Sequence, residues 1–140
     1  MNLDLFSEGW TAAWCEALNA SEAYRLAARD WDGIVALMMT AGGSRSARGA
    51  ILDSAAGACR SARTADSAGL AEAGYVFEAG PDVWEAVFTG RIAPAMALMT
   101  GKLKLSRGSL AALMPHAAAA REMLAAAATI PVRFPPDQDR

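Results

Sequence analysis

The sequence offers few side chains that could carry covalent chemistry. His116 is the only histidine, and the two cysteines, Cys15 and Cys59, are far from it and from each other. A cysteine nucleophile acting on an acyl thioester would need this histidine as its base, and a third group to orient it. No third group is evident, and His116 follows Pro115 at an expected helix start among alanines. We therefore predict no enzyme activity, with a thioester-cleaving enzyme as a weaker alternative.

Metal and phosphate sites are also disfavoured. A zinc site needs three or four ligands, more than one histidine and two remote cysteines supply. The glycines follow neither phosphate-binding spacing, since Gly42-Gly43 suits a hairpin turn and Gly101 a helix end. No metal and no cofactor is expected. The cysteines form no CxxC motif, so we expect reduced thiols in a cytosolic protein, although their spacing does not exclude a disulfide.

The most informative stretch is Gly80–Met114, which is rich in Trp, Phe, Leu and Met but holds no His, Cys or clustered carboxylates. Apolar stripes at helical spacing usually form plain core. Methionine, however, also suits adaptable apolar pockets. Apart from Met1, the whole chain has six methionines: Met38, Met39, Met96, Met99, Met114 and Met123. Because the helices expected in this stretch are short and broken, a ligand cavity competes with plain core.

The remaining pattern predicts the elements that must hold this stretch. We expect helices over about Ser7–Leu18 and Ser21–Arg29, then strands over Trp31–Ala41, Ser46–Asp53, Ala58–Ala65 and Gly74–Ala79. A turn is expected over Ser54–Gly57. The order of elements favours an α+β fold with one mixed or antiparallel sheet covered by helices.

Proline and glycine punctuate the rest of the chain. Helices are expected from Pro81 to Gly90, from Pro94 to Gly101, from Ser109 to Pro115, and on to about Ala128, with a strand at Lys102–Leu105. In that strand the leucines should face inward and the lysines outward. In the last helix Ala119, Met123 and Leu124 should point inward. Residues 1–128 are expected to form a single domain, and 129–140 an extended Pro-rich tail.

The composition limits which partners and which cellular location are expected. The 140 residues are 54% hydrophobic with a net charge of -2. Because no polybasic surface is present, no nucleic-acid partner is expected. No stretch of about 18 residues is continuously apolar, and the first residues lack a basic signal region. The last residues are not a peroxisomal address. We therefore expect a cytoplasmic protein.

The segment GPDVWEAVFTGRIAPAMALMTGKLKLSRGSLAALM resembles the second half of a sterol carrier protein type 2 domain, and Ala97–Leu105 (ALMTGKLKL) is its most specific part. WTAAWCEALNASEAYRLAARDWDG resembles the opening helices and first strand of small stand-alone prokaryotic-type members. The likeness covers roughly Ser7–Ala128. It implies a five-stranded sheet covered on one face by helices, with an apolar tunnel between them.

The resemblance also implies a function: non-catalytic binding and carriage of a fatty acid, fatty acyl-CoA, sterol-like lipid or phospholipid. Transient membrane contact and a homodimer are compatible with it. The residues placed at the tunnel wall by position are Phe77, Trp84, Phe88, Met96, Met99, Leu103, Leu105, Leu110, Leu113 and Met114. Lys102, Lys104 or Arg107 would meet an anionic head, unless they only solubilise the surface.

One departure from the family pattern lies in the second and third strands. Ala47, Gly49, Ala50, Ala58 and Ala62 are small where relatives often carry large apolar residues. Either the tunnel is wider at that end, or another chain covers the sheet edge. The resemblance also leaves an alternative function open, because domains of this kind serve as appended modules on larger enzymes: a structural or dimerisation module with a filled, vestigial cavity.

Overall fold

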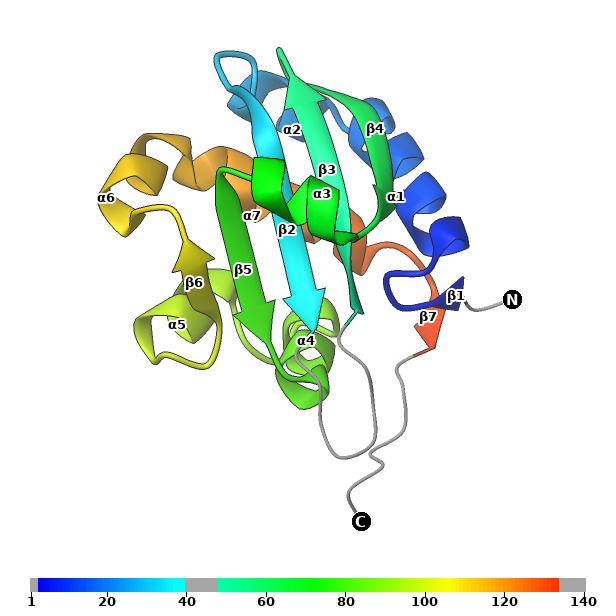
Figure 1. Ribbon diagram of the computed structural model, residues 1–140, viewed down its shortest axis with the longest axis vertical. Helices are drawn as coiled ribbons and strands as arrows, with labels where there is room; N and C mark the ends of the chain where they lie inside the picture. The colour runs from blue at the N-terminus through cyan, green and yellow to red at the C-terminus, as the bar shows by residue number, and fades with distance from the viewer. Residues whose placement is uncertain (1–2, 40–47, 134–140) are drawn as a thin grey trace.

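The core of the molecule is a five-stranded mixed sheet in the order β4-β3-β2-β5-β6 (Figure 1). The computed structural model describes residues 3–39 and 48–133. The strands are β2 Asp32–Met39, β3 Arg48–Ala55, β4 Ala58–Thr64, β5 Tyr75–Ala79 and β6 Lys104–Arg107. Strand β2 pairs with β3 antiparallel and with β5 parallel, while β4 and β6 join the two outer sides antiparallel. The α+β fold expected from the sequence is confirmed.

Most of the helices lie on one face of this sheet. They include α1 Glu8–Ala20, α2 Glu22–Ala27, α4 Pro81–Phe88 and α7 Ala117–Ala128, all behind the sheet in Figure 1. Alternation along β2 turns Val35, Leu37 and Met39 into the core beneath them. Shorter helical pieces, α5 Pro94–Met99, α6 Leu110–Leu113 and the 3-10 turn η1 Met114–His116, lie around β6.

The opposite face of the sheet carries one short helix, α3 Ser67–Glu72, which the sequence pattern did not predict. Asp66 caps it by accepting a hydrogen bond from Gly69 N–H at 2.7 Å. At its other end the Arg107 guanidinium donates to the Leu70 carbonyl and, at 3.1 Å, to that of Ala73. A second, smaller cluster under this helix holds Ala36, Ile51, Ala73 and Val76.

Most expected elements are present, with shifted ends. Ser7 and Ser21 cap α1 and α2 as predicted, because their hydroxyls accept from Trp10 N–H and Tyr24 N–H. The expected strand Lys102–Leu105 was wrong by two residues, since β6 begins at Lys104 and ends at Arg107. Its alternation holds: Leu103 is 1% exposed and Leu105 half-buried, with both lysines exposed.

The β3–β4 hairpin turns at Ala56-Gly57, inside the predicted turn. Both residues have positive φ, 53° and 82°. The type I′ hairpin turn requires this conformation at both central positions. A Cβ on Gly57 would lie 2.4 Å from the Arg25 carbonyl oxygen, so glycine is needed there for two reasons. The expected glycine turn at residues 42 and 43 lies outside the described residues.

Helix α1 closes the outer edge of the sheet along β4. The Asn19 amide bonds both backbone groups of Cys59, donating to its carbonyl at 3.2 Å and accepting from its N–H at 2.8 Å. Ala50 and Ala62 face the same helix layer. Because these side chains are small, α1 can approach the strands closely, and at Cys59 this chain covers its own sheet edge.

The expectation of two reduced thiols was wrong. Cys15 on α1 and Cys59 on β4 form a disulfide, with a Cα–Cα distance of 5.4 Å. The two residues are 44 apart in sequence, and only the packing of α1 along β4 brings them together. Their distance lies within the range a disulfide can span.

The two ends of the described chain meet. Strands β1 Leu3–Asp4 and β7 Val132–Arg133 pair in parallel, away from the main sheet (Figure 1). Ile130, 7% exposed, packs into the main core just before β7. Within the described ranges, no helix is long and apolar enough to cross a membrane.

Candidate lipid-binding site

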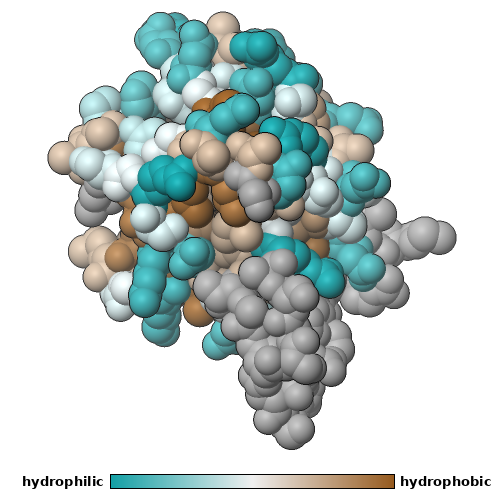
Figure 2. Space-filling model, viewed as in Figure 1, coloured by the Kyte–Doolittle hydropathy of each residue, from teal (hydrophilic) through white to brown (hydrophobic). Residues whose placement is uncertain are grey.

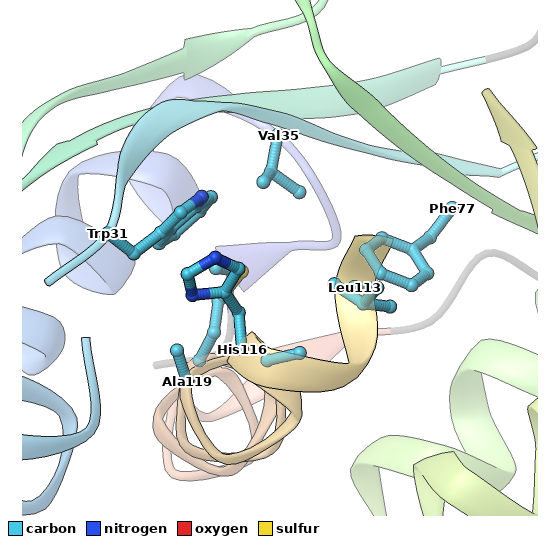
Figure 3. Close-up of a pocket in the computed structure, with 8 residues that line it drawn as sticks. Trp31, Val35, Phe77, Leu113, His116 and Ala119 are labelled. Carbon is cyan, nitrogen blue, oxygen red and sulfur yellow. The ribbon is translucent and has the colours of Figure 1, made fainter. Parts of the chain in front are cut away.

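An apolar pocket lies between the sheet and the helix layer (Figure 3). It is lined by residues from β2, β5, α6, η1 and α7, together with Trp31 just before β2. The lining residues are Trp31, Val35, Phe77, Leu113, His116, Ala119, Ala120 and Met123. All except His116 are apolar or aromatic, so the pocket suits a hydrocarbon chain rather than a polar substrate.

The strands supply the flat wall of the pocket. Val35 on β2 and Phe77 on β5 point to the helix side, because strand residues two apart share a face. Phe77 pairs with Leu37 in the parallel register, two residue pairs further along the strands than the pair of Val35 with Tyr75. Both side chains are buried, with exposed fractions of 2% each.

Four residues at helical spacing form the wall of the pocket opposite the strands. His116, Ala119, Ala120 and Met123 are three or four residues apart, which places them on one face of α7 and the turn before it. Pro115 lies within η1, which redirects the chain between α6 and α7. Leu113, at the end of α6, is thereby turned toward Phe77 (Figure 3).

Small side chains create the empty space. Ala119 is 1% exposed and Ala120 half-buried, yet neither fills the gap opposite the strands. The space that the centre of a water-sized sphere can occupy in the pocket is only about 10 Å³. That is about the room needed for a single water molecule. In this form the pocket is therefore nearly closed, and it must widen before a lipid chain can enter.

His116 is the one ionisable side chain in the lining. Its ring centroid lies 6.3 Å from that of Trp31, with the planes tilted by 39°. Figure 3 shows the imidazole projecting from the helix side toward Trp31 and Val35. No hydrogen bond joins its ring nitrogens to the described part of the chain. The imidazole is therefore free to bond a polar group that enters the pocket.

Two of the ten residues predicted at a tunnel wall, Phe77 and Leu113, line this pocket. Trp84 and Phe88 lie in a packed aromatic cluster instead. Trp84 stacks on Phe88 at 5.4 Å between centroids, meets Phe6 edge-on at 5.6 Å, and donates from Nε1 to the Met38 carbonyl at 2.9 Å. Leu103 is buried in the same core and Leu105 packs partly against it. Contact of these four with a ligand stays a prediction.

The predicted methionines lie on the surface. Met96, Met99 and Met114 have exposed fractions of 51%, 81% and 62%. The side chain of Leu110 lies outside the described part of the structure. None of these four lines the pocket in Figure 3, so their contact with ligand also stays a prediction.

Sequence reasoning did not place six lining residues at a binding site: Trp31, Val35, His116, Ala119, Ala120 and Met123. The inward direction of Ala119 and Met123 was predicted, and Met123 was counted among the methionines that suit an apolar pocket, but neither residue was placed at the tunnel wall. The run HAAAAREM, residues 116–123, held a signal, because it places small residues at helical spacing on the face that carries Met123. His116 was considered as a catalytic base and as a zinc ligand, but not as part of an apolar pocket.

The polar chemistry nearby is structural. Tyr24 and Ser54 share a buried hydrogen bond of 2.6 Å between their hydroxyls. Burial raises the pKa of the Tyr24 phenol, and the bond to Ser54 offsets this only in part. Both cysteines are held in the disulfide, so neither offers a thiolate to an acyl thioester.

Comparison with known proteins identifies close structural relatives. A crystal structure described as sterol carrier protein 2 superposes with a TM-score of 0.83 at 42% identity, covering 91% of this chain and 99% of that chain. The solution structure of a conserved hypothetical protein of Thermus thermophilus, whose description suggests a sterol carrier protein, gives 0.81 at 41% identity, covering 94% and 93%.

A more distant structure shares the fold alone. The apo form of sterol carrier protein 2 from Yarrowia lipolytica gives a TM-score of 0.55 at 17% identity, covering 84% of this chain and 88% of that one. A scan against models of protein families finds no match. A search of curated proteins also finds none.

Proposed function

Because this chain belongs to the sterol carrier protein 2 family, we propose that it binds and carries apolar lipids without transforming them. The observation that carries this proposal is the apolar pocket between sheet and helices, with a single polar side chain in its lining. The names of the similar structures support a lipid ligand. We extend this to a fatty acid, fatty acyl-CoA, sterol-like lipid or phospholipid.

Hydrocarbon burial can supply the affinity. Each buried methylene contributes about 0.8 kcal/mol, so a chain of about fourteen would gain roughly 11 kcal/mol before the costs of ordering and association. Because the present cavity of about 10 Å³ has room for little more than one water molecule, binding must widen the pocket. The α6–η1 segment is suited to move, since only Leu113 of its described side chains is fully buried.

A substitution that fills the pocket from the helix side tests this proposal. Ala119→Leu adds three carbons opposite Phe77 and Val35. Binding of a fluorescent fatty acid, measured by titration, should weaken by at least about tenfold, the equivalent of two lost methylene contacts. Ala73→Leu is the matched control, because Ala73 is 3% exposed in the cluster on the opposite face of the sheet. That variant should bind like the wild type.

Two results would count against the proposal. Equal weakening in both variants would indicate a general effect of overpacking. A folded wild type that binds no lipid, and from which organic extraction recovers none, would favour the structural or dimerisation module.

Two further features belong to this proposal. We infer that the chain does not cleave thioesters through a cysteine, because that mechanism would need a free thiol and both cysteines are disulfide-bonded. The disulfide counts against the expected cytoplasmic location, because disulfides are more typical of oxidising compartments. Alkylating free thiols in intact cells before lysis would test it. A cytoplasmic protein should be trapped with both cysteines alkylated.

A further inference from the structure

The large exposed apolar side chains are concentrated on one part of the molecule. Among the described residues, four large hydrophobic side chains are strongly exposed: Leu26, Met96, Met99 and Met114. Three of these four lie within 19 positions of sequence, on α5 and at the start of η1. Met99, at 81%, is the most exposed of them. Isolated exposed hydrophobic residues are ordinary, but a group of them marks an interaction surface.

The charge of the same stretch is unusual for this chain. Residues 86–121 hold no aspartate or glutamate, although the whole chain has a net charge of -2. The stretch contains five cationic side chains: Arg91, Lys102, Lys104, Arg107 and Arg121. The rest of the molecule is therefore acidic, and this stretch is its basic part.

Some of these cations have partners. Arg91 lies 3.8 Å from Glu85, Arg121 lies 3.4 Å from Glu122, and Arg107 bonds the end of α3. Lys104 is paired in register with Glu78 across the strands, although no ion pair joins them. Lys102 is exposed and has no ion pair within the part of the chain that the structure describes. This lysine, three residues after Met99 in sequence, is thus available to an external anion.

The elements that carry these residues lie together. Helices α5 and α6 lie on either side of β6, at the edge of the sheet (Figure 1). In the same view, Figure 2 shows pale-brown residues over α5 and α6 with hydrophilic residues between them. Met96 and Met99 are three residues apart on α5 and share one face of it. Lys102 follows within one turn. We call Met96, Met99, Lys102, Lys104 and Met114 the β6-edge surface.

This surface adjoins the pocket through the chain itself. Leu113 and His116, which line the pocket, flank Met114 within four residues. A membrane or protein in contact with Met114 would therefore also touch the α6–η1 segment, which must move for a lipid to enter the pocket. The surface and the entry route are parts of one short piece of backbone.

We propose that the β6-edge surface docks on membranes that expose anionic phospholipids, and that lipid passes between membrane and pocket there. This rests on the proposed lipid-carrier function. Flexible apolar side chains next to lysines match the boundary between acyl chains and anionic headgroups. A protein partner is less suited, because the methionines are separated by a basic strand rather than gathered into one apolar core.

Vesicle co-sedimentation tests the proposal. Wild-type protein should bind phosphatidylcholine vesicles containing about 30% phosphatidylglycerol at least about tenfold more strongly than pure phosphatidylcholine, and this preference should fall in high salt. Met99→Glu should reduce binding to the mixed vesicles by about tenfold or more. Lys102→Glu should remove most of the preference for anionic vesicles.

Leu26→Glu is the matched control, because Leu26 is 59% exposed on α2 and outside the basic stretch. It should bind vesicles like the wild type. Equal losses in Leu26→Glu and Met99→Glu would overturn the proposal. So would a wild type that does not bind anionic vesicles, which would favour a protein partner for this surface.

A second measurement separates this proposal from the function beneath it. Binding of a dissolved fluorescent fatty acid, without vesicles, should be unchanged in Met99→Glu. If wild type binds the fatty acid but not the vesicles, only the docking proposal fails. If wild type binds no dissolved fatty acid, the carrier function fails first.

Discussion

The indole N–H groups of the four tryptophans differ in what they contact. Trp14 donates to the Met123 carbonyl at 3.1 Å, and Trp84 donates to that of Met38 at 2.9 Å. Trp10 is fully buried between Phe6 and Trp14, and its Nε1 has no hydrogen-bond partner among the described residues. An unpaired buried donor costs free energy, while a paired one contributes to stability. Similar side chains in one cluster therefore have different energetic roles.

This difference can be measured with one pair of substitutions. Trp14→Phe removes a hydrogen bond as well as volume, so it should lower the free energy of unfolding by about 1 kcal/mol more than Trp10→Phe. Trp10→Phe loses similar volume but also removes the unpaired donor. Urea denaturation of both variants under the same conditions gives the comparison. Equal losses, or a larger loss in Trp10→Phe, would show that the Trp10 N–H is bonded in solution.

At the scale of elements, α3 depends on an ionised cap. The pKa of the Asp66 carboxyl is lowered mainly by the Gly69 N–H bond, and further by Arg63, whose guanidinium lies 3.3 Å away. A lowered pKa in the folded state gives stability that is present at neutral pH and lost as the pH falls through that pKa. Helix α3 should therefore weaken in acid.

Asp66→Asn tests this at fixed geometry, because asparagine keeps the capping acceptor but cannot ionise. Wild type should be the more stable protein at about pH 7, and its advantage should shrink below about pH 4, where the carboxyl protonates. Urea unfolding of both proteins across that range gives the difference. An advantage that stays constant into acid would mean that the charge at Asp66 does not contribute.

The contact between α1 and β4 is the second element-scale feature. The disulfide closes a separation of 44 residues, and a cross-link over such a loop typically contributes about 2–4 kcal/mol. The double variant Cys15→Ser, Cys59→Ser should lose about that much stability, and wild type in a strong reductant should lose a similar amount. Native wild type in which both thiols react readily with a thiol reagent would contradict the disulfide.

Element positions were largely predictable because their signals are local. Pro81 and Pro94 stand at the first positions of α4 and α5, and Ser7 and Ser21 supply the caps of α1 and α2. Helix α3 was missed because SAGLAE holds only one large apolar residue. Its stability comes from Asp66 at one end and Arg107 at the other. The Arg107 contact is not visible in local sequence.

At the scale of the whole molecule, the binding site was only partly predictable. The family resemblance placed Phe77 and Leu113 at the tunnel wall by position, and both line the pocket. The empty space itself arises where Ala119 and Ala120 face the sheet, and a missing side chain leaves no apolar pattern to detect. The aromatic residues that looked most like a tunnel wall, Trp84 and Phe88, contact each other and Phe6 instead. In this protein the large aromatic side chains fill the core, and the empty space lies beside the small side chains of Ala119 and Ala120.

The central claim is that a lipid chain enters between Phe77 on the sheet and Ala119 on α7. The most direct measurement is an isotope-filtered NMR experiment on the folded protein with a carbon-13-labelled fatty acid. We predict nuclear Overhauser contacts from the chain to the methyl groups of Ala119 and Met123 and to the rings of Phe77 and Trp31. Contacts confined to surface residues such as Met96 and Met99, with none to Ala119 or Phe77, would contradict the account.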